Sequence, residues 1–328
     1  MEAVARNKHL STFGLWSEDT TDYALEQVGK MLESNDVVES LSIDNADLVT
    51  GKGVESIGNG LMKNRNVKTI TLRVGKTSDE SMLPLFRTLS KPDSPVRMLT
   101  FTTKSEEESE RFGDRAAIAL SQHLEKNKEL LVLNLQHTNI GDIGATAIFQ
   151  ALANHTELNH LALRNCSKIT DAGGVIIGQY IESDPGLTEL MLDHSSIGDQ
   201  GARYIGKALS KNSHLDTLSL VNTPISDTGA LAIVSGMNDN MILTDVVLRR
   251  TGRNVREMWR EALLPKIEKD TEKMLADILK RNKEWKPLVH RLAELEGKTA
   301  AAAAAAARGE QDDDSSQTTT AGERHSEL

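Results

Sequence analysis

Polar side chains that could do chemistry recur in a narrow part of this 328-residue chain. His137 and His194 lie on either side of Asn165, and Arg164 and Asp193 directly precede two of these residues. Imidazole nitrogens are common zinc ligands, but a zinc site usually needs four donors at about 2.0–2.1 Å. The two histidines should lie two strands apart, roughly 10 Å. The pattern therefore does not favour a metal site.

Other motifs that would signal catalysis or cofactor binding are missing from the sequence. No G-x-x-x-x-G-K-[ST] loop, H-E-x-x-H pair or cysteine pair for zinc is present. The single cysteine, Cys166, occupies a position where a side chain is expected to satisfy the backbone groups of a loop. The sequence predicts a protein without catalytic residues, cofactor or metal.

The elements that position these side chains are specified by an internal repeat. In one copy, leucines at 130, 133 and 135 are followed by Thr138 and Ile140, and then by Gly144, Ile148 and Leu152. Further copies occupy residues 158–181, 187–209 and 215–237. A fixed period of about 28 residues is typical of a stacked repeat protein rather than a closed globule.

The repeat extends beyond its clearest copies. Successive strand starts are spaced by 28, 29, 29, 34, 28, 29, 28 and 28 residues, and they fall at Leu10, Val38, Val67, Val96, Leu130, Leu158, Leu187, Leu215 and Leu243. The one long spacing reflects an insertion at residues 103–111, TKSEEESER, which we expect to form a solvated acidic loop.

Each repeat should form one strand and one helix. The leucines alternate like the inward side chains of a short strand, and the period then changes to that of a helix. A Gly or Ala in the first turn should let the helix approach the sheet closely. Asn or Asp tolerates the left-handed conformation that often ends a helix. We expect that conformation at Asn35, Asn64, Asp93, Asn127, His155, Asp184, Asn212 and Asn240.

This pattern resembles the leucine-rich repeats of the ribonuclease-inhibitor type over roughly residues 10–250. The period, the helical half and Cys166 at the position that takes Asn or Cys all match. The resemblance implies an α/β leucine-rich repeat solenoid, with a curved parallel sheet and helices on the convex side. About eight repeats and a final strand would fill residues 1–250.

The sequence changes character after Leu248. Residues 249–298 hold 14 Lys/Arg and 9 Asp/Glu and show helical spacing of apolar residues. We expect residues 251–298 to form a basic helical cap that covers the last repeat, and an outer face that binds a partner is the alternative. Residues 299–328 contain an alanine run and a polar tail, and we expect them to be disordered.

The outward positions of the strands carry the functional prediction. Equal positions of neighbouring strands lie about 4.8 Å apart, so Arg164 should lie beside Asp193 and His160 beside Glu189. Such pairs are most often surface salt bridges. The alternative is a polar concave surface that docks a protein, for which the predicted contact residues are Gln136, His137, Arg164, Asn165, Asp193, His194, Asn222, Arg249 and Arg250.

The composition of the chain limits the classes of partner that we expect it to bind. A net charge of −10 argues against nucleic acid, and no stretch approaches the roughly 18 apolar residues of a membrane helix. One cysteine and an N-terminus without a secretory apolar core suggest the cytoplasm, with nucleus or cilium as alternatives. We expect a protein-interaction scaffold. The alternatives are a GTPase regulator similar in architecture to the Ran GTPase-activating proteins, and a cytoskeletal or axonemal component similar to tropomodulin.

Overall fold

The computed structural model describes residues 2–90, 94–105, 107, 110–183, 185–248, 269–284 and 286–287. Two compact units divide the chain, residues 1–282 and 283–328. The predicted contact residues Arg249 and Arg250, the expected helix-end residues Asp93 and Asp184, and the tail from 299 onward lie outside the described residues. All of the described repeats belong to the first unit.

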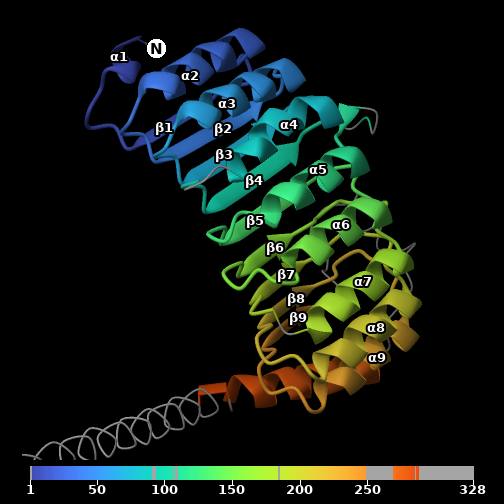
Figure 1. Cartoon of the computed structure of the whole chain (residues 1–328). Coiled ribbons are helices and arrows are strands. Elements are labelled where there is room, and N and C mark those ends of the chain that lie inside the picture. Colours follow the sequence, from blue (N-terminus) through green and yellow to red (C-terminus); the bar gives the residue numbers. More distant parts are fainter. Residues whose placement is uncertain are drawn as a thin grey trace, which may run out of the picture. The chain divides into compact units, whose positions relative to one another are not determined.

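Nine strands of the described residues form one parallel sheet in which the order along the sheet is the order along the chain. Each repeat thus adds one strand beside the previous one (Figure 1). The strands are β1 Thr12–Trp16, β2 Ser40–Ala46, β3 Thr69–Val74, β4 Met98–Thr103, β5 Val132–Gln136, β6 His160–Ala162, β7 Glu189–Met191, β8 Thr217–Ser219 and β9 Asp245–Val247.

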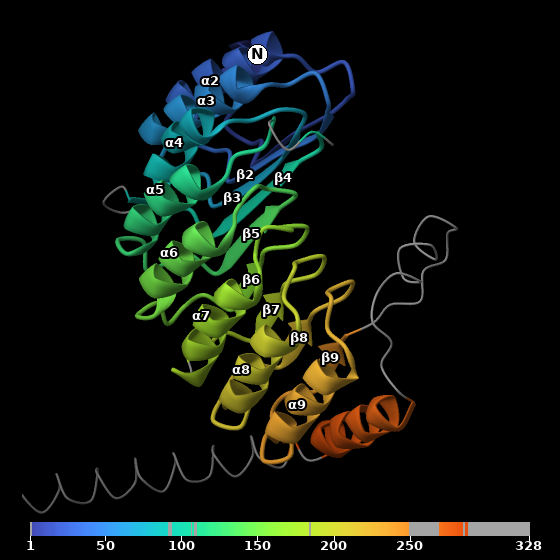
Figure 2. The same ribbon diagram turned by 90° about the vertical axis from the view of Figure 1, so that its right-hand side faces the viewer.

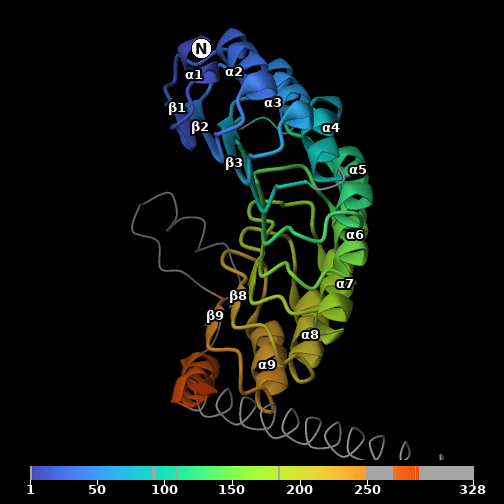
Figure 3. The ribbon, with the colours of Figure 1, turned by 60° about the vertical axis from the view of Figure 1, so that its left-hand side comes forward.

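The helices cover one face of this sheet, and the strands line the inner, concave side (Figure 3). A short helix α1, Glu2–Ala5, and a 3₁₀ turn, Thr88–Ser90, flank the repeating helices. These are α2 Asp22–Ser34, α3 Gly51–Lys63, α4 Asp79–Arg87, α5 Asp114–Leu124, α6 Asp142–Leu152, α7 Asp171–Glu182, α8 Asp199–Leu209 and α9 Asp227–Met237. The predicted leucine-rich repeat solenoid is confirmed.

The core lies between the two layers and consists of the repeat leucines. Leu130, Leu133 and Leu135 are fully buried, as are the helical residues Ile148 and Leu152. The first repeat differs: Leu10 is 37% exposed, whereas the corresponding residues of the later repeats, such as Val38 and Leu130, are buried. The apolar period therefore predicts the core well except at the open N-terminal end.

An aspartate ladder joins successive repeats at the beginnings of their helices. In Asp142, Oδ1 accepts hydrogen bonds from the backbone N–H of Thr170 and of Gly173, at 2.7 and 2.8 Å. A Cβ at Gly173 would lie 2.7 Å from this same oxygen. The small residue is thus needed for the approach of the preceding aspartate, in addition to the close packing that we expected. The ladder comprises Asp22, Asp79, Asp114, Asp142, Asp171 and Asp199.

A second set of side chains, the asparagine ladder, joins repeats at the ends of their helices. Asn64 Nδ2 donates to the carbonyls of Leu32 and Asn35 at 2.9 and 2.8 Å, and its Oδ1 accepts from the N–H of Asn66 and Val67. These residues were expected to be left-handed, and that prediction is wrong. Asn35 and Asn64 are extended, with φ of −84° and −75°. At all six positions of the ladder the side chain accepts the N–H three residues further on, and these positions are Asn35, Asn64, Asn127, His155, Asn212 and Asn240. Asn127 Nδ2 and His155 Nε2 are buried without the hydrogen bond to an earlier repeat that Asn64, Asn212 and Asn240 make.

The insertion after β4 is held at its C-terminal end. The carboxylate of Glu110 accepts hydrogen bonds from Lys76 and Ser105, and the pair with Lys76 lowers the pKa of that carboxyl. The Arg111 Nε donates to the Ser105 carbonyl at 2.9 Å. Residues 106, 108 and 109 lie outside the described residues, so the expected acidic loop is described only in part.

A helix over residues 269–284 contacts the last repeat through residues that belong to the first unit (Figure 2). The guanidinium of Arg281 donates to the carbonyls of Met237, Asn238 and Asn240 at 2.9–3.1 Å. Asn282, fully buried, donates to Leu243 O at 2.7 Å. These donors satisfy the carbonyls that a following repeat would otherwise occupy, as a solenoid end requires.

Candidate functional site

The concave face of the sheet is built from side-chain rows in register. Strand pairing places Trp16 opposite Asp44, and Thr102 opposite Gln136. Ion pairs connect neighbours along these rows: Arg73 Nη1 lies 2.7 Å from Asp44 Oδ2. This regular spacing follows from parallel pairing, since equal positions of each repeat then fall on one line. The register shifts once, by one residue, between Ile43 and Ala46 where β2 pairs with β3.

The two predicted neighbour pairs are confirmed. His160 Nδ1 lies 2.8 Å from Glu189 Oε2, and Arg164 Nε lies 3.0 Å from Asp193 Oδ2. The second pair lacks the alignment of a hydrogen bond at Nε, and the Arg164 guanidinium also contacts the Met191 sulfur. Both are partly exposed pairs of the kind that contribute about 0–1 kcal/mol each to stability.

Asp193 is a buried residue that bonds neighbouring repeats to one another rather than an exposed contact residue. It is only 8% exposed, and its Oδ1 accepts hydrogen bonds from the Val221 N–H at 3.0 Å and from the Ser219 hydroxyl. Its other oxygen faces Arg164. The buried carboxylate is thus satisfied by three groups of neighbouring repeats, as a buried charge must be. A direct role of Asp193 in partner binding stays a prediction that its burial does not favour.

The row of His and Asn residues after the strands has a conformational cause. His137, Asn165, His194 and Asn222 all adopt the left-handed conformation, with φ of 52°, 56°, 59° and 57°. Asn and His are among the residues enriched there. Backbone N–H groups of this turn row donate to the next repeat; for example, the His137 N–H bonds the Arg164 carbonyl at 3.0 Å. The repeated residue types therefore reflect the turn first, and their outward side chains second.

Burial shifts the pKa of two side chains in and beside the turn row. Burial lowers the pKa of His137, and the nearby Arg111 and His194 lower it further. In the same loops, Cys166 is fully buried and its Sγ lies 3.1 Å from Thr138 Oγ1. Burial raises the pKa of this thiol to about 11. Cys166 is consequently a structural residue, as predicted, and not a nucleophile at neutral pH.

The structure brings most of the predicted contact residues together along the ends of β5 to β8. Gln136, His137, Arg164, Asn165, His194 and Asn222 are half-buried there, while Asp193 is buried. His194 Nε2 lies 3.2 Å from Asn222 Nδ2. Arg249 and Arg250, predicted to continue the strip, are not among the described residues. Whether any of them contacts a partner stays a prediction.

Sequence reasoning assigned no special weight to Trp16, which the structure makes prominent. This indole is 67% exposed on the outward side of β1. Its six-membered ring lies over Gly14, where any Cβ would collide with it. The signal in the sequence was a glycine two residues before an aromatic residue, which puts both on the same face of a strand. Only the structure shows that the ring lies flat and open.

Hydroxyl side chains occupy the concave face beside Trp16. These side chains are half-buried and form no hydrogen bond to the described residues. They belong to Ser40, Ser42, Thr69, Thr71, Thr100 and Thr102. Small hydroxyls can donate and accept hydrogen bonds with many partners. This half of the concave face therefore carries short polar side chains with hydrogen-bonding capacity that the described residues do not use.

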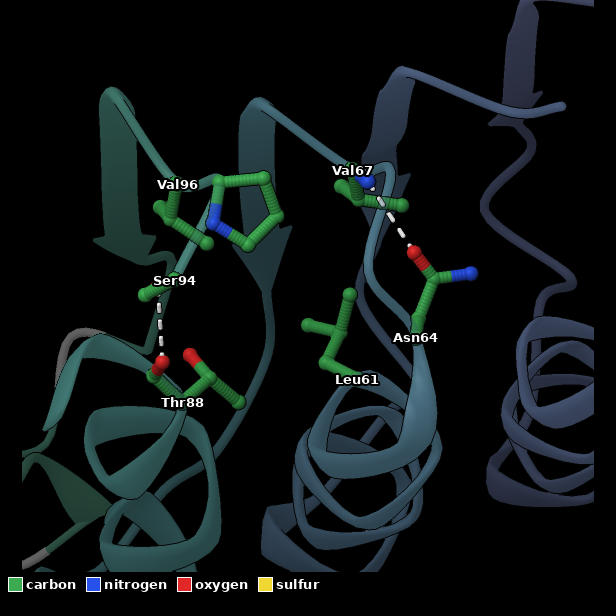
Figure 4. A pocket seen from close by; sticks show the side chains of 7 residues that line it. Leu61, Asn64, Val67, Thr88, Ser94 and Val96 are labelled. Atoms are coloured by element: carbon green, nitrogen blue, oxygen red, sulfur yellow. Dashed lines mark hydrogen bonds between the residues drawn. The ribbon is translucent and has the colours of Figure 1, made fainter. Parts of the chain in front are cut away.

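Within the described parts of the chain, no three His, Cys, Asp or Glu side chains gather into a possible metal site. No helix among those residues has the length and apolarity needed to cross a membrane. A cavity of about 10 Å³ lies beside Ser94, whose hydroxyl donates to the Thr88 carbonyl (Figure 4). A space of this size holds at most about one water molecule, so it offers no cofactor site.

Comparison with known proteins agrees with the repeat architecture. The family model described as "Leucine Rich repeat" matches residues 126–149 and 211–234. The bovine (Bos taurus) protein "NACHT, LRR and PYD domains-containing protein 9" is 25% identical over 167 residues, which is 50% of this chain. The matched part is 16% of that relative's own length. Both matched segments lie within the repeat array and agree with its leucine-rich repeat fold, and the likeness to repeats of the ribonuclease-inhibitor type stays a resemblance of the sequence.

Three solved structures show some likeness to this chain. "Leiomodin-1 Actin-Binding Site 2 (ABS2)" matches with a TM-score of 0.44 and 18% identity, over 54% of this chain and 95% of that one. The Caenorhabditis elegans tropomodulin C-terminal domain matches with a TM-score of 0.43 and 14% identity, over 53% and 96%. The yeast Rad7 and Elc1 complex matches with a TM-score of 0.44 and 13% identity, over 72% of this chain and 63% of that one.

Proposed function

We propose that this protein is a non-catalytic scaffold that binds a protein partner across the concave face of its sheet. A leucine-rich repeat array is a protein-interaction architecture, since its inner face is a wide surface of outward side chains on a rigid frame. The observation that carries the proposal is Trp16, an exposed indole held against Gly14 on that face. Interface hot spots are enriched in tryptophan.

The surroundings of Trp16 support this use. Asp44 lies opposite it on β2 and is paired with Arg73 on β3, so an apolar anchor stands beside a fixed pair of charges. The hydroxyl-bearing strands β2 to β4 continue the surface. Such a site offers one aromatic contact surrounded by polar groups, which is the common anatomy of a protein interface.

The proposal is tested with two exposed aromatic residues of the same repeat. Trp16→Ala removes the indole on the concave face, whereas Tyr23→Ala removes an aromatic side chain that is 70% exposed on α2 of the helical face. We expect Trp16→Ala to weaken partner binding about tenfold or more, and Tyr23→Ala to leave it unchanged. The full chain is immobilised, partners from the native source are quantified by mass spectrometry, and affinities of the purified partner are then measured.

A third variant separates the indole from its position. Gly14→Ala keeps Trp16 but forces the ring off its platform, so binding should fall by an intermediate amount. All variants should melt at nearly the same temperature, since Trp16 buries little area. Equal partner recovery by the wild type and the Trp16 variant would contradict docking at this anchor.

The two alternative functions stay predictions, because no contact of the described residues favours either. The basic segment that suggested a cytoskeletal component falls largely outside those residues. Co-sedimentation with actin filaments or microtubules tests that alternative. A single-turnover GTP hydrolysis assay tests regulation of a GTPase.

A further inference from the structure

The ends of β5 to β7 carry a local excess of positive and hydrogen-bond-donating side chains on a chain of net charge −10. We name this surface the cationic rim, and it consists of Arg111, His137, Arg164, Asn165 and His194. Arg111 and Arg164 carry the positive charge of the rim. Burial, and then Arg111 and His194, lower the pKa of His137, so its imidazole is a neutral hydrogen-bonding group at neutral pH.

The one acidic side chain at these strand ends is already bonded to groups of the protein. At the strand-end positions 136–137, 164–165, 193–194 and 221–222, Asp193 is the one acidic residue. It is 8% exposed and receives the Val221 N–H, the Ser219 hydroxyl and Arg164. Its charge is therefore directed into the protein, and it offers little to a ligand outside.

The outward donors are held in place by the backbone. The left-handed turns at His137 and Asn165 are tied to the next repeat by N–H bonds of 3.0 and 2.8 Å. The Arg111 Nε bond to the Ser105 carbonyl orients its guanidinium. The Asn165 side chain, half-buried, has no hydrogen bond to the described residues. Donors that are fixed before binding lose little conformational entropy when they bind.

We propose that the cationic rim binds an acidic peptide segment of the protein partner, one rich in Asp and Glu side chains. The carboxylates would accept hydrogen bonds from Asn165 and from the imidazole and guanidinium groups. Hydrogen bonds of this kind are stronger when the donor or the acceptor is charged. This inference rests on the proposed scaffold function and names the chemistry of a second contact on it. A segment that also reached Trp16 would span the sheet from β1 to β7.

The test uses the full chain and labelled peptides of equal length. One peptide carries Asp and Glu, a second carries Asn and Gln at the same positions, and a third carries Lys. We expect fluorescence anisotropy to show binding of the acidic peptide alone, and binding should weaken as NaCl rises from about 50 to about 300 mM because charge attraction is screened.

A matched pair of variants locates the contact. Asn165→Asp and Asn45→Asp make the same change at the same left-handed turn position of two repeats, where Asn165 and Asn45 have φ of 56° and 57°. Asp tolerates this conformation. Asn165→Asp should weaken binding of the acidic peptide about tenfold. Asn45→Asp lies in the second repeat, where Lys104 contacts Asn45, and it should change binding less than about twofold.

Several results would overturn the inference: no binding of the acidic peptide at about 50 mM NaCl, equal binding of the Lys peptide or of an oligonucleotide, or equal losses in the two Asp variants. Tighter peptide binding after deletion of residues 308–328 would assign the rim to the chain's own acidic tail, and would also overturn it. If Trp16→Ala abolishes partner recovery while the acidic peptide fails to bind, the inference alone fails. If neither Trp16→Ala nor Asn165→Asp alters recovery, the proposed function fails too.

Discussion

One position of the asparagine ladder is occupied by a histidine, and this makes a sharp prediction about stability. Asn64 and Asn240 each donate two hydrogen bonds to backbone carbonyls and accept two from backbone N–H groups. His155, 1% exposed, accepts one from Leu158 at 3.2 Å, and its buried Nε2 forms no well-aligned hydrogen bond, although the Asn127 backbone interacts with the ring. His155→Asn should therefore stabilise the fold.

The magnitude follows from the bonds gained and the packing lost. Up to three additional hydrogen bonds contribute about 1 kcal/mol each. The smaller side chain leaves space whose cost is about 1–2 kcal/mol. The expected net gain is about 1 kcal/mol in the free energy of unfolding at neutral pH. For a unit of this size the melting temperature should rise by about 2 °C.

The gain should grow as pH falls. Burial, and then Lys128, lower the pKa of His155 in the folded state, and they outweigh the Asn127 backbone and Glu157, which raise it. The unfolded chain therefore takes up this proton at a higher pH than the folded chain does, so the wild type loses stability as pH falls below the ordinary histidine value of about 6.5. The asparagine of the variant would carry no such proton, and the difference between the two proteins should be larger at about pH 5.5 than at about pH 7.5.

Thermal unfolding of the two proteins at about pH 7.5, 6.5 and 5.5 measures both effects. The reverse change, Asn64→His, is the control: it should lower stability by about 2–3 kcal/mol and make it more sensitive to acid. A lower melting temperature for His155→Asn at neutral pH, or a difference that stays constant or shrinks as the solution is acidified, would refute the account of the ladder.

Three further predictions concern other contacts between repeats. Asp142→Ala removes the acceptor that joins α6 to the next repeat and should lower the free energy of unfolding by about 2–3 kcal/mol, as measured by urea denaturation. Arg281→Ala should cost about 2 kcal/mol because three carbonyls of the last repeat lose their donor, and the exposed neighbour Lys280→Ala should cost almost nothing in the same assay. Cys166, fully buried with its pKa raised to about 11, should not react with a thiol reagent at about pH 8 until urea unfolds the protein, and prompt labelling of the native protein would contradict its placement.

The fold could be predicted from the sequence in considerable detail. The leucine period specified parallel strands in chain order, and it specified the neighbours Arg164 with Asp193 and His160 with Glu189. The ends of the helices could not be predicted so well. Asn64 was expected to be left-handed, but its side chain bonds the preceding repeat and the backbone stays extended. A rule for an isolated helix cannot anticipate a partner that lies 29–32 residues earlier in the chain.

The candidate site divides in the same way. The sequence alone determined which strand residues point outward, because in parallel strands paired in register the alternation of each strand is shared by its neighbours. Only the tertiary structure decided which of them remain available. Asp193 is covered because Ser219 and Val221 of the next repeat reach its carboxylate, whereas Trp16 is open because it lies on the first strand, over a glycine. Exposure depends on the side chains of adjacent repeats, and a single period carries no information about them.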